Sequence, residues 1–180
     1  MSTPLTSEFH RPLSADQIGV HETVREIAAN PSERDLLAKR FDLLSLDRLT
    51  AKLRLRRGHG GLIDVHGSFE AEVVQACVVT LDPVRQGLAE EFEISFRPAA
   101  GDVPAVTVDL DHDDSTEPMF DGRLDLGEIV TQQLAVALDP YPRSPSAPER
   151  LGGAAGEGAA VQAEGPFSVL RRWPGKRADR

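Results

Sequence analysis

The chain has 180 residues, of which 40% are apolar, and its formal net charge is −9 at pH 7. This length suits one domain with terminal extensions, and the apolar content can form a core without metals or disulfides. The negative charge argues against a protein that coats nucleic acid, because such binding depends on neutralising phosphates. No segment approaches the roughly 18 apolar residues that cross a bilayer, so we expect no membrane contact and a cytoplasmic location.

The first thirty residues predict two strands. Residues 8–13 can form a short edge strand, where the missing N–H of Pro12 does no harm. Residues 21–28 fit either a strand or a helix, because only half of the residues on one parity are apolar. We favour a strand.

A short helix follows. Asn30 can cap it, Pro31 suits its first position, and Glu33 stands where a capping box needs an acid. Leu37 and Phe41 then lie on one apolar face, and we expect the helix to end near Asp42.

From Leu46 the pattern changes to the alternation of a strand. One face of this strand is apolar and consists of Leu49, Ala51, Leu53 and Leu55. The other face carries the basic stripe, which we define as Arg48, Lys52, Arg54 and Arg56. The glycines of residues 58–61 permit a turn after it.

A long hairpin comes next. Alternation from Ile63 predicts one strand that runs through Cys77 in mid-strand to Leu81, with Gly67 at a bulge or bend. The apolar face of this strand includes Val65, Phe69, Ala71, Val73, Cys77, Val79 and Leu81. Asp82-Pro83 breaks the run, and a second alternating strand starts at Val84.

The second half predicts a short strand at residues 106–110, an acidic run from Asp109 to Glu117, and a second helix. The acidic run does not fit a calcium loop, because Asp114 replaces the required glycine and Phe120 the final glutamate. Asp125 can cap the helix and Glu128 occupies the capping-box position. Its apolar stripe consists of Leu126, Ile129, Val130, Leu134, Ala137 and Leu138.

These elements predict an α+β fold: an antiparallel β-sheet meander that can curl towards a barrel, with two helices and a flexible C-terminal tail. We assign the domain to residues 1–143. A linker rich in Pro, Gly and Ala occupies residues 144–165, and residues 166–180 form an apolar and basic tail.

The basic stripe is the first candidate site for RNA. Its cations recur about every 7 Å on one strand face, close to the phosphate spacing of a single nucleic-acid strand, and Arg57 extends them. The alternative is an ordinary polar outer face, paired with Glu70 and Glu72 on the next strand. The stripe lacks the aromatic residues that stack on bases, so we expect no sequence-specific recognition.

The C-terminal tail contains the other candidate sites. Its basic residues Arg171, Arg172, Lys176 and Arg177 can contact RNA, or they can form an ordinary solvated terminus. Its apolar residues Phe167, Val169 and Leu170 are expected to dock, either on their own domain or on a partner.

Three separated segments resemble the YceD family, in the same order. They are the hairpin motif with Cys77, Leu81, Pro83 and Val84, the helix that begins Asp125-Leu126, and the closing residues 165–170. The resemblance implies a non-enzymatic factor of large ribosomal subunit biogenesis, needed for accumulation or processing of its ribosomal RNA. The implied partner is ribosomal RNA or a pre-ribosomal particle. The main alternative is an acidic adaptor that binds a basic large-subunit ribosomal protein without touching RNA.

Many members of that family carry a Cys-x-x-Cys at the hairpin, whereas this chain has Thr80 at the second position. A structural zinc site needs about four ligands, mostly thiolates or imidazoles. We therefore expect no metal or cofactor, and we interpret Cys77 as a small buried apolar residue. No phosphate-binding loop or nucleophile motif occurs, so we expect neither catalysis nor a small-molecule substrate; a nuclease or RNA-modifying enzyme is a weaker alternative.

Overall fold

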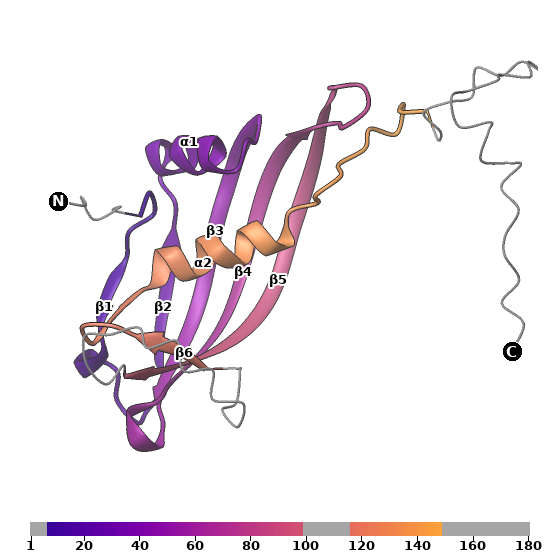
Figure 1. Cartoon of the computed structure of the whole chain (residues 1–180). Helices are drawn as coiled ribbons and strands as arrows, with labels where there is room; N and C mark the ends of the chain where they lie inside the picture. Colours follow the sequence, from indigo (N-terminus) through magenta and orange to yellow (C-terminus); the bar gives the residue numbers. More distant parts are fainter. Residues whose placement is uncertain (1–6, 99–115, 149–180) are drawn as a thin grey trace, which may run out of the picture. The chain divides into compact units, whose positions relative to one another are not determined.

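The computed structural model of the chain describes residues 7–98 and 116–148. All its helices and strands belong to one compact unit, Met1–Ala147 (Figure 1). The strands are β1 (Pro12–Ser14), β2 (Thr23–Ala28), β3 (Ser45–Arg57), β4 (Ile63–Ala76), β5 (Pro83–Pro98), β6 (Thr116–Met119) and β7 (Arg123–Asp125). The helices are α1 (Pro31–Arg40) and α2 (Leu126–Ala137), and short 3₁₀ turns cover Ala15–Gln17 and His59–Gly61.

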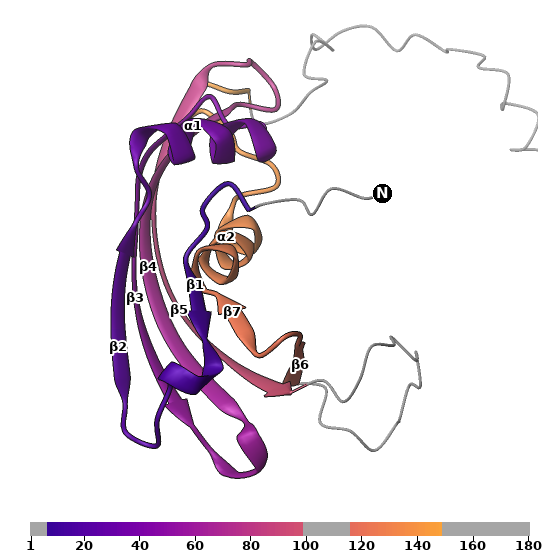
Figure 2. The same ribbon diagram turned by 90° about the vertical axis from the view of Figure 1, so that its left-hand side faces the viewer.

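The predicted α+β fold is confirmed. Strands β2 to β5 form an antiparallel meander, and β6 adds to β5 in parallel, so the strand order is β2-β3-β4-β5-β6. Among the described strands this sheet is open, with β2 and β6 at its ends, and β1 pairs with β7 in a separate two-stranded sheet. The sheet is curved, and α2, β1 and β7 lie on its concave side (Figure 2).

The core lies between the concave side of the sheet and α2. The predicted apolar face of β3 is buried, as is that of β4 from Ile63 to Val73. Helix α2 contributes Leu126, Val130 and Leu134. A β-carbon on Gly127 would lie 1.7 Å from the carbonyl oxygen of Phe9, so the close contact between this helix and the N-terminal segment requires glycine.

The capping box predicted for α1 is confirmed. The side chain of Asn30 accepts a hydrogen bond from the Glu33 amide, and the Glu33 carboxylate accepts one from the Asn30 amide. Arg11 also donates two hydrogen bonds to this carboxylate, at 2.7 and 2.9 Å. These bonds from Arg11 are the main reason why the pKa of Glu33 lies below its ordinary value.

For α2 the cap is confirmed, but the capping box is not formed. Asp125 accepts hydrogen bonds from the amides of Gly127 and Glu128. The carboxylate of Glu128 binds Arg40 of α1 at 2.9 Å and the hydroxyl of Ser7 at 2.9 Å. A guanidinium is a stronger partner than a backbone amide, so the tertiary contact takes the place of the local one.

Strand β1 differs from its prediction. It covers Pro12–Ser14 and pairs with β7, not with an edge of the large sheet. Phe9, from the segment predicted to be a strand, is fully buried in the core instead. Burial of the Phe9 ring prevails over the weak alternation of residues 8–13.

The predicted position of Cys77 in mid-strand is wrong. Strand β4 ends at Ala76, and residues 77–82 form the turn to β5. Cys77 is buried as expected, but Leu81 is exposed and has a positive φ of 63°. A left-handed residue reverses the chain here, and for a leucine this conformation costs about 1 kcal/mol or more.

Gly67 is not at a bulge either. The register shift lies between Leu46 and Arg48, whereas Gly67 pairs in regular register with Leu53 and Phe92. A β-carbon on Gly67 would lie 2.1 Å from the ring of Phe92. Glycine therefore leaves room for an aromatic ring from the neighbouring strand.

The strand predicted at residues 106–110 and the acidic residues before 115 lie outside the described residues. The described helices are too short to cross a membrane.

Candidate interaction surface

The outward side of the large sheet carries the basic stripe on β3. The register places Lys52 between Glu26 of β2 and Ser68 of β4, and places Arg54 opposite His66. Strand β5 continues these rows with Glu91 opposite Ser68 and Glu93 opposite His66. Period-two alternation thus brings residues from four strands onto one exposed face.

Three of the four stripe cations have carboxylate partners. Arg48 lies 2.7 Å from Glu70 and 3.4 Å from Glu72, as the sequence alternative for the stripe expected. The other two pairs are Lys52 with Glu26 at 3.0 Å and Arg56 with Asp64 at 3.7 Å. Each such pair is exposed and contributes little stability, but it neutralises a cation that a phosphate would need.

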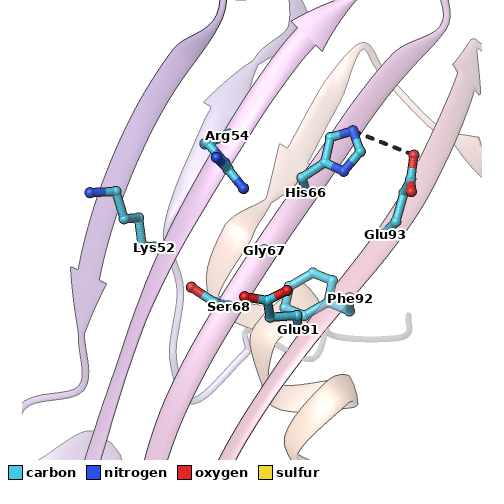
Figure 3. A pocket seen from close by; sticks show the side chains of 8 residues that line it. All are labelled: Lys52, Arg54, His66, Gly67, Ser68, Glu91, Phe92 and Glu93. Atoms are coloured by element: carbon cyan, nitrogen blue, oxygen red, sulfur yellow. Dashed lines mark ion pairs between the residues drawn. The ribbon is translucent and has the colours of Figure 1, made fainter.

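Arg54 is the stripe cation without an ion pair among the described residues. It borders a surface hollow of about 450 Å³ (Figure 3). The hollow is lined by Lys52, Arg54, His66, Gly67, Ser68, Glu91, Phe92 and Glu93. Cationic side chains come from β3, carboxylates come from β5, and His66 lies 3.4 Å from Glu93.

A second hollow of about 480 Å³ adjoins the first, because both are lined by Lys52 and Ser68. Its rim includes Glu26 and Glu70. The hollows exist because short side chains, such as that of Ser68, lie between long charged ones. By the register, this outward face carries six cations, which are the four of the stripe together with Arg85 and Arg97 of β5. Its carboxylates are Glu26, Asp64, Glu70, Glu72, Glu91 and Glu93, and Arg85 also pairs with Asp47 at 2.9 Å.

Arg57 has another role in the structure. Its guanidinium donates hydrogen bonds to the carbonyl oxygens of Ile18 and Ala15, and its amide donates to Gly19. These bonds fasten the segment before β2 to the end of β3. The side chain therefore lies away from the stripe that it was predicted to extend.

The hairpin motif forms a nest around sulfur. The buried Sγ of Cys77 accepts hydrogen bonds from the amides of Val79 and Thr80, both at 3.4 Å, and from Ser144 at 3.3 Å. The Ser144 amide, followed by the Thr80 side chain, lowers the pKa of Cys77 from 9.0 to about 6. The expected burial of Cys77 is confirmed, and the hydrogen bonds that it accepts from three backbone amides, which the sequence did not predict, connect the turn to the segment after α2.

The remaining motif residues have structural roles. Pro83 begins β5, where Val84 pairs with Gln75. Asp125 caps α2 and also accepts the Arg11 amide at 2.8 Å, while Leu126 is buried. Within residues 7–98 and 116–148, no three His, Cys, Asp or Glu side chains are grouped as a metal site requires.

The tail residues lie outside the described residues. They are Arg171, Arg172, Lys176 and Arg177, proposed for RNA, and Phe167, Val169 and Leu170, proposed for docking. Their roles stay predictions. Ser144 and Ser146, at the start of the predicted linker, are described and contact the hairpin turn through Cys77 and Asp82.

Comparison with known proteins agrees with the resemblance of these motifs. Neither the curated proteins nor the solved structures gave a match. One protein-family model matches residues 65–172, from β4 into the C-terminal part of the chain. Its description is "Large ribosomal RNA subunit accumulation protein YceD". Because this match covers more than half of the sequence, the chain belongs to the YceD family.

Proposed function

We propose that this protein is a non-enzymatic factor that supports accumulation or processing of the large-subunit ribosomal RNA by binding a component of the pre-ribosomal particle. The family description supports the link to this RNA. The exposed face of β2 to β5 supports binding as the mode of action, because it offers a broad, charged and open surface. We expect the protein to act in the cytoplasm.

Two modes of binding follow from this surface. In the first, the basic stripe contacts RNA phosphates. Arg54 favours it, because this cation has no carboxylate partner among the described residues and faces the hollow around Ser68. However, an RNA strand on the stripe would displace the carboxylates of Glu26 and Glu70 from Lys52 and Arg48.

In the second mode, the protein is an adaptor for a basic large-subunit ribosomal protein. The net charge of −9 favours it, and so does the pairing of three stripe cations with carboxylates, which leaves Arg54 as the one stripe cation without an ion pair among the described residues. Glu91 has no ion pair among the described residues, and Glu93 has only His66, which carries charge only when protonated. The neutralisation of three stripe cations, beside the carboxylates of Glu91 and Glu93 at the hollow, is the observation that carries our choice, and we favour the adaptor mode.

The test uses cells in which the protein can be depleted. We expect depletion to lower the ratio of large-subunit to small-subunit ribosomal RNA, and the wild-type chain to restore it. Crosslinking in the same cells then separates the modes: an adaptor crosslinks to one or a few basic proteins, and an RNA-binding factor crosslinks to RNA directly. An unchanged RNA ratio after depletion would contradict the proposed function.

A further inference from the structure

The turn between β4 and β5 holds a leucine in a conformation that suits glycine. Leu81 has φ of 63°, fixed by hydrogen bonds from its amide to the Cys77 carbonyl at 2.9 Å and from the Cys77 amide to Asp82 at 2.8 Å. Glycine or asparagine would adopt this conformation with less strain. Leu81 is also 76% exposed, so its side chain gains almost no burial in return. The fold therefore gives no reason for leucine here. Non-glycine residues with a strained positive φ concentrate at functional positions.

Two more exposed apolar side chains belong to the same end of the sheet. Val78 is 50% exposed in the turn, and Tyr141 is 73% exposed in the segment after α2. A hydrogen bond of 2.9 Å from the Val78 amide to the Pro142 carbonyl joins the two segments, which run side by side in Figure 1. We call Val78, Leu81 and Tyr141 the apolar tip. The bond between Val78 and Pro142 holds two segments with exposed apolar side chains together, and apolar side chains exposed at one end of a domain mark a candidate interaction site.

We propose that the apolar tip docks a basic segment of a partner protein, whose apolar side chains contact Leu81 and whose cations face Asp82 and Asp139. We infer a basic partner from the carboxylates that lie beside the apolar tip in the sequence. Asp82 follows Leu81 directly and Asp139 precedes Tyr141 by two positions, and neither carboxylate has an ion pair among the described residues. The two carboxylates outnumber Arg143, the single cation of residues 138–148. A cationic partner would pair with both.

The same charges disfavour the other occupants. RNA would bring phosphates against two carboxylates. A second copy of this chain, docked tip to tip, would place the carboxylates of both copies together. That the basic partner is a large-subunit ribosomal protein rests on the proposed function; the docking site itself does not.

The experiment immobilises the full chain and offers it two RNA-free probes: total protein extracted from large ribosomal subunits, and the basic proteins of the remaining cell extract. Each retained protein is quantified for wild type, Leu81→Asn and Asp82→Asn/Asp139→Asn. Val20→Asn is the matched control. Val20 is 69% exposed and borders His59 at the β3–β4 turn, the opposite end of the long strands. The melting temperature and oligomeric state of each variant are measured in parallel.

We expect Leu81→Asn to keep or raise the melting temperature, because asparagine tolerates positive φ. It should nevertheless lower retention of basic large-subunit proteins about tenfold, the loss typical of a central interface side chain. Asp82→Asn/Asp139→Asn should weaken retention and reduce its salt dependence, and Val20→Asn should change neither.

Equal retention by wild type and Leu81→Asn would overturn the proposal. So would a clear fall in the melting temperature of Leu81→Asn, which would mean that the side chain packs within its own chain. A wild-type dimer that Leu81→Asn dissociates would also overturn it. Retention that depends on Leu81 but involves only the non-ribosomal basic proteins would keep the docking site and contradict the ribosomal partner. A normal ribosomal RNA ratio after depletion would instead contradict the proposed function alone.

Discussion

The amide of Ser144 donates a hydrogen bond of 3.3 Å to the sulfur of Cys77, 67 positions earlier in the chain. Together with the bond from Val78 to Pro142, it fastens the segment after α2 onto the β4–β5 turn. The turn that carries Leu81 is thus held in place by a residue from the other half of the domain. The sulfur of Cys77, which accepts hydrogen bonds from three backbone amides, is the centre of this arrangement.

The first prediction concerns the pH dependence of stability through Cys77. Its pKa is lowered from 9.0 to about 6 in the folded protein, so the thiolate contributes stability that is fully present above pH 9 and is lost as pH falls towards 6. Cys77→Ser has no charge to lose in this range. We expect the stability advantage of wild type over Cys77→Ser to grow as pH rises from 6 to 9, measured by urea unfolding. A constant difference over this range would contradict the thiolate.

The second prediction concerns the contact between the two helices. Glu128→Gln removes the charge that binds Arg40 at 2.9 Å, and we expect a loss of about 1 to 2 kcal/mol at neutral pH, since the pair is partly buried and bonded to charge. Hydrogen bonds from Arg40 are the main reason why the pKa of Glu128 is lowered. The difference between wild type and variant should therefore vanish as pH falls through that lowered pKa.

The matched control for this change is Glu26→Gln, which removes a carboxylate at 3.0 Å from Lys52 in a far more exposed pair. Its effect should stay within about 0.5 kcal/mol. If chemical denaturation gives equal losses of unfolding free energy for Glu128→Gln and Glu26→Gln, burial does not make the Arg40 pair more stabilising than an exposed pair.

The third prediction concerns Gly67. An alanine there would place its β-carbon 2.1 Å from the Phe92 ring, and we expect a loss of about 1 to 3 kcal/mol from the forced displacement. Gly87→Ala on β5 is the control, because no atom lies within 4 Å of the added carbon. A double variant with Phe92→Leu should recover part of the loss, which a double-mutant cycle would measure. Equal stabilities of the two alanine variants would argue against the close contact.

Local patterns predicted the parts of this fold that depend on local physics. The buried face of β3 follows from alternation, and the Asn30 and Asp125 caps from residue type at a helix start. The errors occur where a residue far away in the sequence determines the local contact. Glu128 binds Arg40 instead of its own helix end, and Gly67 accommodates a ring from β5.

The candidate site shows the same division. Alternation placed the basic stripe on one face and offered Glu70 and Glu72 as its partners, but only the register to β2 and β4 reveals that Glu26 and Asp64 neutralise two more of its cations. The exposed position of Leu81 was missed because the alternation of β4 seemed to continue beyond Ala76. Asp82-Pro83 could have indicated the turn at Leu81. The residue before a proline is held extended, so the reversal of chain direction must occur at an earlier residue.

If the outward face binds a basic protein and does not bind RNA phosphates, one variant of the basic stripe tests this most directly. This variant replaces all four stripe cations by glutamine (Arg48→Gln, Lys52→Gln, Arg54→Gln and Arg56→Gln). It removes the stripe charge without placing like charges beside Glu26 or Glu70. The measurement is the affinity of wild type and this variant for RNA-free large-subunit proteins and for large-subunit ribosomal RNA, each over a range of salt. We predict equal or tighter binding of the proteins and no change for RNA. Weaker RNA binding, with the slope of log affinity against log salt reduced by about 3 to 4 units, would contradict the adaptor mode and establish the stripe as a phosphate site.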